Sequence, residues 1–175
     1  MPFPLADFHD IAADIRSGRS SATQQMQHSW ETAQSAACRH TFRRLNPNAL
    51  AQAQHADAAL PLAGLAVSVK DLFDVAGEVS ASGSQVLASN PPAMQDCAVV
   101  ARLKAAGGVV IGRTHMVEFA FSGMGVNPHF GTPVNPLALA VDPATPRIPG
   151  GSSSGAAVSV ASGAAVVGLG SDTGG

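Results

Sequence analysis

Small side chains dominate the last part of the chain, from Gly150 to Gly175. This segment begins with Gly-Gly-Ser-Ser-Ser-Gly, contains only Ala, Val, Ser and Gly over residues 156–163, and ends with Gly-Leu-Gly-Ser-Asp-Thr-Gly-Gly. A helix without bulky side chains can approach other backbone closely on every side. We therefore expect a central, buried helix here, followed by a buried strand over residues 165–170.

Helical signals occupy most of the first 60 residues. Asp7 is a good N-cap for a first helix that Gly18 ends, and Asn46-Pro47-Asn48 is a turn signal. The helices are expected over residues 7–17, from Ser20 or Ser21 to about Thr41, and over residues 49–59. We interpret residues 1–60 as a helical arm that leans against a domain formed by residues 61–175.

Strand signals begin after this arm. Residues 64–69 are β-prone and lead into Lys70. Asp96 is expected to cap a helix that ends at a glycine pair, and the apolar run from Val109 to Ile111 then predicts a buried strand. A strand, a helix and a strand in this order predict an α/β fold with helices packed on the sheet. The stretch 114–149 is rich in proline and glycine, which is typical of a long functional loop.

Composition and charge exclude several classes of function. The formal net charge is −2, only 13% of the residues are charged, and Lys and Arg form no stripe, so we expect no direct contact with nucleic acid. The two cysteines lack CxxC spacing and the six histidines lack metal-ligand spacing, so we expect no disulfide, metal or cofactor. The sequence shows no leader-like or membrane-spanning stretch, which predicts a cytoplasmic protein without membrane contact.

Two glycine-rich binding loops match the last segment poorly. Gly150 and Gly155 have the spacing of a phosphate-binding loop, but Ala156 stands where that loop needs lysine. Gly-Leu-Gly at 168–170 resembles the start of a dinucleotide fingerprint, but Thr173 replaces its third glycine. The segment therefore does not predict a nucleotide site.

A third partial match is the nucleophile elbow Gly-x-Ser-x-Gly, which residues 151–155 fit with Ser153 at the centre. That elbow needs a strand directly before the serine. Here the preceding residues, 143–149, contain three prolines, which disfavour a strand. We interpret Ser153 or Ser154 as a helix N-cap instead.

Taken as a whole, the last segment resembles the signature of the amidase signature family. The Gly-Gly-Ser-Ser-Ser-Gly turn, the small-residue helix and the terminal Gly-Ser-Asp-Thr-Gly-Gly all agree with it. Further similarity lies in Ser68-Val69-Lys70-Asp71, in residues 96–114, in Glu118–Ala120 and in Phe130–Pro136. The resemblance covers residues 61–175 and implies a central mixed β-sheet covered by helices, of which this chain is the N-terminal part.

The resemblance implies a Ser-cisSer-Lys triad. Lys70 matches the lysine and Ser152 the cis-serine, and the nucleophilic serine is expected directly after Gly175, so residues 1–175 alone are expected to be inactive. A lysine can act as a base only when it is neutral, and burial favours the neutral form by lowering the lysine pKa. Asp71 would oppose this effect, but adjacent strand residues face opposite sides of a sheet.

The resemblance also implies where substrate binds. The backbone N–H groups of Thr173, Gly174 and Gly175 lead into the expected nucleophile and are candidates for an oxyanion hole. The segment Ala120-Phe121-Ser122 resembles the substrate-facing loop of the family. We expect Asp172 to hold its loop by hydrogen bonds.

Three functions are consistent with these features. The first is a stand-alone amidase that acts on small-molecule amides, and the loop over residues 121–129 looks most like stand-alone bacterial amidases. The second is the amidase subunit of a tRNA-dependent amidotransferase, which releases ammonia from glutamine and needs partner subunits. The third is a non-catalytic fragment. The resemblance also allows a homodimer.

Overall fold

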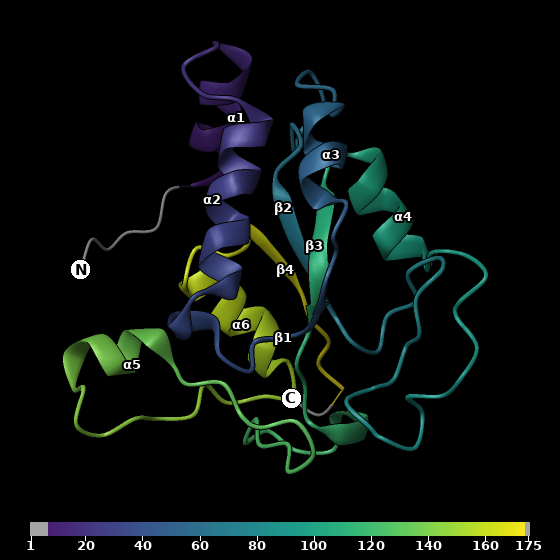
Figure 1. The fold of residues 1–175 in the computed structure, drawn as a ribbon, viewed down its shortest axis with the longest axis vertical. Helices are drawn as coiled ribbons and strands as arrows, with labels where there is room; N and C mark the ends of the chain where they lie inside the picture. Colours follow the sequence, from purple (N-terminus) through teal and green to yellow (C-terminus); the bar gives the residue numbers. More distant parts are fainter. Residues whose placement is uncertain (1–6, 174–175) are drawn as a thin grey trace.

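A four-stranded mixed sheet forms the centre of the fold in the computed structural model, which describes residues 7–173. Its strands are β1 (Phe42–Leu45), β2 (Ala66–Lys70), β3 (Val109–Thr114) and β4 (Val167–Leu169), in the spatial order β1-β3-β2-β4. Strand β2 runs parallel to β3 and β4, and β1 runs antiparallel to β3 (Figure 1). The α/β class and the mixed sheet are thus confirmed.

Helices cover this sheet. They are α1 (Phe8–Arg16), α2 (Ala22–Gln34), α3 (Ala49–Gln54), α4 (Ala98–Ala105), α5 (Pro136–Val141) and α6 (Ser154–Ala161), with 3₁₀ turns at Ala36–Cys38 and Glu118–Ala120. The predicted N-caps of the first two helices are confirmed. The Asp7 carboxylate accepts a hydrogen bond from the His9 backbone, and the Ser21 hydroxyl accepts one from the Gln24 backbone.

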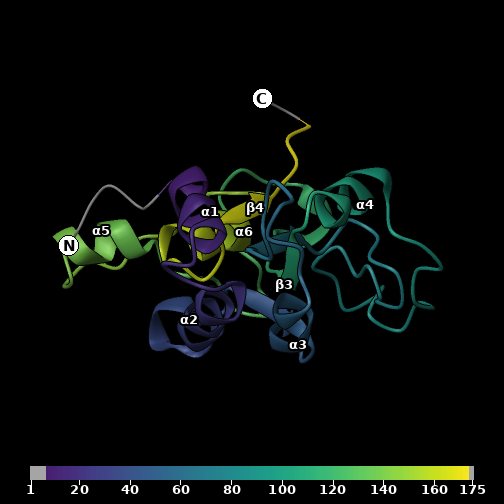
Figure 2. The ribbon, with the colours of Figure 1, turned by 90° about the horizontal axis from the view of Figure 1, so that it is seen from above.

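Alternation along β2 divides the core into two layers. Ala66 packs with residues of α2 and α3, whereas Val67 and Val69 pack with Val100 of α4 on the other face. In Figure 2, α3 and α4 accordingly lie on opposite sides of β3. Helix α6 lies on the Ala66 face, where the hydroxyls of Ser159 and Ser68 are 2.7 Å apart. Lys70 has the same parity as Ala66, so it points toward α6.

The second helix is shorter than predicted. It ends at Gln34 rather than near Thr41, because Ser35 adopts an extended conformation and the chain then turns through Ala36–Cys38. The following residues form β1, which the sequence analysis missed. Strand β1 gains its backbone hydrogen bonds from β3, to which it is antiparallel. The third helix likewise ends at Gln54 instead of residue 59.

The predicted role of Asp96 is also wrong. The N-cap position of α4 is Cys97, and no side chain caps this helix. The Asp96 carboxylate instead accepts hydrogen bonds from the Ala76 backbone and from Lys104 Nζ, both at 2.8 Å. These partners come from a distant loop and from the far end of α4, so local spacing could not indicate them.

Two further differences concern the second half of the chain. Helix α5 lies inside the stretch expected to be a loop, and Asn135 caps it by accepting hydrogen bonds from the Leu137 and Ala138 backbones. The predicted buried strand over residues 165–170 is only β4, with Gly168 exposed, because β4 lies at an edge of the described sheet. Among residues 7–173, no helix has the length and apolar character that crossing a membrane requires.

Candidate active site

Lys70 is the last residue of β2 and lies completely inside the protein. Its side chain is 0% exposed, and all five residues of β2 are buried. The ammonium nitrogen Nζ lies 2.6 Å from Ser152 Oγ, 2.9 Å from Ser171 Oγ and 3.4 Å from the Ser171 carbonyl oxygen. The fold therefore brings Lys70 and Ser152, which are 82 residues apart in the sequence, into direct contact.

Ser152 lies in the glycine-rich turn that precedes α6. The peptide bond between Gly151 and Ser152 is cis, and Gly150 has a φ of 81°, a conformation that glycine adopts readily. The Ser152 carbonyl accepts a hydrogen bond from the Val117 backbone at 3.0 Å, and Gly151 N–H donates to the Gly123 carbonyl at 2.8 Å. These bonds attach the serine turn to the segment that follows β3.

Burial and one neighbouring charge act on Lys70 in opposite directions. Desolvation lowers the pKa of the Lys70 ammonium, and the smaller effect of the Asp172 carboxylate raises it. Asp71 lies on the opposite face of the strand, as the alternation of strand side chains predicts. There its carboxylate is 3.6 Å from Arg113 Nε and accepts a hydrogen bond from the Gly83 backbone. A lysine in this environment is suited to act as a base.

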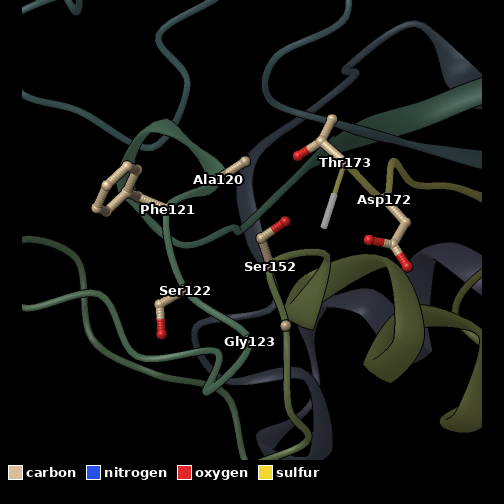
Figure 3. A pocket seen from close by; sticks show the side chains of 8 residues that line it. Ala120, Phe121, Ser122, Gly123, Ser152, Asp172 and Thr173 are labelled. Carbon is tan, nitrogen blue, oxygen red and sulfur yellow. The ribbon is translucent and has the colours of Figure 1, made fainter. Parts of the chain in front are cut away.

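A pocket of about 460 Å³ opens in front of Ser152. The residues that line it are Ala120, Phe121, Ser122, Gly123, Gly151, Ser152, Asp172 and Thr173. Figure 3 shows Ser152 between the 120–123 loop and the segment that carries Asp172 and Thr173. The Ala120 methyl points toward the pocket, whereas the Phe121 ring points away from Ser152 and is 90% exposed.

The pocket thus brings together residues that the sequence analysis singled out in three places: the 120–122 segment, Ser152 and Thr173. Lys70 lies behind Ser152, outside the pocket lining. Gly174 and Gly175, which were expected to contribute backbone N–H groups, lie outside the described residues.

Ser171 is a contact of Lys70 that the sequence analysis missed. Besides its two contacts with Nζ, its backbone N–H donates to Ser153 Oγ at 3.2 Å, and Ser153 Oγ lies 3.2 Å from the Ser171 carbonyl. Ser153 occupies the N-cap position of α6, one of the two positions predicted, but its side chain makes no cap hydrogen bond to the helix. A serine directly before Asp172 is the only local signal of this contact, and the contact itself joins positions 101 residues apart.

The pocket wall has an unusual backbone. Phe119 and Ala120 have φ values of 53° and 58°, in the left-handed region that side chains with a Cβ seldom adopt. Such conformations cost free energy and persist only where surrounding contacts enforce them, and they cluster at functional sites. Ala120 lines the pocket and Phe119 directly precedes it, which supports a functional role for this segment.

Histidines lie away from the pocket lining. His115 is buried, and desolvation together with the charges of Arg43 and His40 lowers its pKa to about 4. His129 Nε2 is 3.1 Å from a carboxylate oxygen of Glu118. Within the described part of the chain, no cluster of three or more His, Cys, Asp or Glu side chains could hold a metal ion.

Comparison with known proteins gives consistent matches. The family model described as Amidase matches residues 21–175. Over 117 residues the chain is 51% identical to 2-amino-5-chloromuconic acid deaminase of Comamonas testosteroni, covering 66% of this chain and 24% of that protein. Over 172 residues it is 39% identical to one of the subunits of the glutamyl-tRNA(Gln) amidotransferase of Ralstonia nicotianae, covering 94% of this chain and 33% of that protein.

Solved structures share the fold. The native peptide amidase of Stenotrophomonas maltophilia superposes with a TM-score of 0.77 at 30% identity, covering 94% of this chain and 35% of that one. The chain therefore spans about a third or less of the length of each of these proteins.

Proposed function

This chain belongs to the amidase family, and from that premise we propose that it is the N-terminal part of an enzyme that hydrolyses amide C–N bonds. The observation that carries the proposal is the buried Lys70, whose Nζ lies 2.6 Å from Ser152 Oγ behind an open pocket. We propose that the nucleophile is a serine C-terminal to Gly175, so that residues 1–175 alone are inactive.

The proposed reaction proceeds by two linked proton transfers. Neutral Lys70 accepts the Ser152 hydroxyl proton while Ser152 accepts the proton of the nucleophilic serine, whose oxygen attacks the substrate carbonyl carbon. The protons return by the same path to the leaving nitrogen, so the C–N bond breaks, an amine departs and an acyl-enzyme remains. A water molecule then attacks the acyl carbon by the same relay and releases the carboxylic acid.

Negative charge develops on the substrate carbonyl oxygen during this attack, and hydrogen-bond donors must stabilise it. We assign this role to the backbone N–H groups of Thr173, Gly174 and Gly175, of which Thr173 lines the pocket. Loss of one such donor typically lowers kcat by about 10²–10³. Ala120, Phe121 and Ser122 line the same pocket, and we assign this segment to bind the substrate, a small linear amide.

A second candidate is supported by one comparison. The match to the amidotransferase protein extends over 94% of this chain, further than the match to the deaminase. In that case the amide is the side chain of glutamine, the product is ammonia, and partner subunits are required. In either case we propose a cytoplasmic enzyme without direct nucleic-acid or membrane contact, with a homodimer as the form of the stand-alone amidase.

The test compares the full-length protein with its Lys70→Ala and Ser152→Ala variants, measured by ammonia release from propionamide and from glutamine. We expect each variant to lose about 10²–10⁴-fold in kcat, because each removes a step of the proton relay. Lys104→Ala is the matched control, since Lys104 forms a partly exposed ion pair with Asp96 and neither residue lines the pocket.

Turnover of propionamide by the protein alone supports the stand-alone amidase, and turnover of glutamine only with partner subunits supports the amidotransferase. Circular dichroism checks that the variants fold. Full activity in a folded Lys70→Ala variant, or no amide hydrolysis by the full-length protein under either condition, would contradict the proposal and favour a non-catalytic protein.

A further inference from the structure

Asn127 is a buried hub between three loop segments. It is 1% exposed. Its amide nitrogen donates to the Gly83 carbonyl at 2.7 Å and to the Met116 carbonyl at 2.9 Å, and its Oδ1 accepts a hydrogen bond from the His129 backbone at 2.9 Å. Two carbonyl partners on one side and an N–H partner on the other define the orientation of this amide. A carboxylate could not replace it, because an oxygen would then face two carbonyl oxygens.

The hub holds a tight turn formed by Ser82 and Gly83. Gly83 has a φ of 66°, and a Cβ added there would lie 2.8 Å from the Met116 carbonyl oxygen. Two hydrogen bonds anchor the same turn to Asp71, from Ser82 N–H to the Asp71 carbonyl and from Gly83 N–H to its carboxylate. The turn is therefore fixed on one side to the strand end that carries Lys70 and on the other side to Asn127.

The same turn restrains the unusual backbone of the wall. Phe119 N–H donates to the Ser82 carbonyl at 2.9 Å. Ala120, the first residue of the wall, and Phe119, which directly precedes it, have left-handed φ values, which need enforcing contacts to persist. A continuous set of hydrogen bonds thus runs from the Lys70–Asp71 strand end, through the 82–83 turn that Asn127 clamps, to the wall of the pocket.

We propose that Asn127 is a positioning residue that sets the place of the pocket wall, Ala120–Gly123, relative to Lys70 and Ser152, and thereby determines which acyl groups the pocket accepts. The selectivity part of this inference rests on the proposed amide hydrolysis. Asn127 itself touches neither the pocket lining nor Lys70 in the described contacts. Its effect on the reaction is exerted through the 82–83 turn and Phe119.

The central experiment is Asn127→Asp in the full-length protein, with Asn135→Asp as the matched control. Both variants exchange an amide for a carboxylate, but the hydrogen bonds of Asn135 to the Leu137 and Ala138 backbones use only Oδ1, which aspartate retains. The measured quantity is the ratio of kcat/KM for propionamide to kcat/KM for benzamide. This ratio does not depend on the concentration of active enzyme, so partial unfolding does not change it.

We expect Asn127→Asp to change this ratio by about tenfold or more, since small displacements of binding groups have effects of this size. The pH at which kcat/KM is half-maximal should stay at its wild-type value, because Lys70 and its contacts remain. Asn135→Asp should keep the wild-type ratio. An unchanged ratio in a folded Asn127→Asp variant would overturn the proposal.

Hydrogen exchange provides a readout that does not need activity. Peptides covering residues 117–123 should exchange faster in Asn127→Asp than in Asn135→Asp, because the Phe119–Ser82 hydrogen bond is weakened. Equal exchange overturns the positioning role. If the wild-type protein hydrolyses neither of these two amides, nor glutamine in the presence of partner subunits, the proposed function fails, whereas faster exchange in Asn127→Asp still supports the positioning role.

Thr132→Val covers the case in which Asn127→Asp does not fold. Thr132 Oγ1 accepts a hydrogen bond from the Asn127 backbone at 3.3 Å, so the valine loosens the hub without adding a charge. We expect this variant to change the ratio of the two kcat/KM values by less than Asn127→Asp does and to exchange faster over residues 117–123. Both results together support the proposal. Wild-type values for both quantities overturn it.

Discussion

At the scale of single residues, the environment of Lys70 decides what this site can do. A solvated lysine is protonated near neutral pH and cannot accept a proton from a serine. Burial on the sheet lowers the pKa of Lys70, and the negative charge of the Asp172 carboxylate limits this decrease. The rate of a reaction that needs neutral Lys70 therefore rises with pH, with a midpoint below the ordinary pKa of lysine.

This balance gives a prediction for Asp172→Asn. The change removes the negative charge that favours the ammonium form, so the pKa of Lys70 falls further and the rising limb of kcat/KM moves to lower pH. The measurement is a pH profile of amide hydrolysis by the full-length protein. Asp142→Asn, at the C-cap of α5, serves as the control and should keep the wild-type profile. A shift to higher pH, or none, would show that Asp172 does not act on Lys70 in this way.

At the scale of elements, helix α6 places the serine turn by approaching the sheet very closely. Its buried residues are Ser154, Gly155, Ala156, Val158 and Ser159. Gly155 lies where β3 ends, and its N–H donates to the His115 carbonyl at 3.0 Å. A Cβ added at Gly155 would be 2.5 Å from the His115 backbone nitrogen. Small side chains are therefore needed for the helix to hold Ser152 against Lys70.

Gly155→Ala tests this close approach. We expect the variant to lose about 1–3 kcal/mol of unfolding free energy, because the methyl group must displace backbone rather than a flexible side chain. Urea unfolding followed by circular dichroism measures the loss. Ala157→Ser, on the exposed side of the same helix, should change the stability by less than about 0.5 kcal/mol. Equal stability of the two variants would mean that α6 tolerates a larger separation from β3.

At the scale of the whole molecule, a buried ion-pair cluster joins the sheet to the long loop between β2 and α4. Arg113 of β3 is 1% exposed, and its Nε lies 3.6 Å from a carboxylate oxygen of Asp71 and 3.8 Å from one of Glu78. Desolvation raises the pKa of Asp71 and lowers that of Arg113, so each charge depends on the other. The contacts of Arg113 with Asp71 and Glu78 therefore join the loop to the sheet at the strand end that carries Lys70.

Arg113→Met should accordingly destabilise the protein by about 3–5 kcal/mol, because it leaves the buried Asp71 carboxylate without the guanidinium group that lies 3.6 Å from it. The comparison is Arg19→Ala, which breaks the exposed pair with Asp14 and should cost less than about 1 kcal/mol. Urea unfolding of the wild-type protein and both variants at one pH gives the loss of unfolding free energy in each variant. A loss below about 1 kcal/mol in Arg113→Met would show that the cluster contributes no more than a surface pair.

Part of the fold could be predicted from local sequence, whereas the candidate site residues followed from the family resemblance. The Asp7 and Ser21 caps depend on groups two or three residues away, and those predictions are confirmed. The small residues over 154–159 predict a buried helix because side-chain volume alone limits how closely a helix can pack. The contact of Lys70 with Ser152 followed from the family resemblance, and their proposed catalytic roles stay predictions.

Other features depended on partners far away in the sequence. Residues 42–45 form a strand because the edge of β3 offers them hydrogen bonds, and Asp96 binds Lys104 and Ala76 rather than capping α4. The contacts of Ser171 and Asn127 could not be predicted from local sequence, since their partners are brought to them only by the folded chain. The sequence by itself thus determined the caps of the first helices and the small-residue helix, because these depend on near neighbours or on side-chain volume. The tertiary structure alone decided the edges of the sheet, the contact of Lys70 with Ser171 and the restraint of the pocket wall, because each is a hydrogen bond between distant segments.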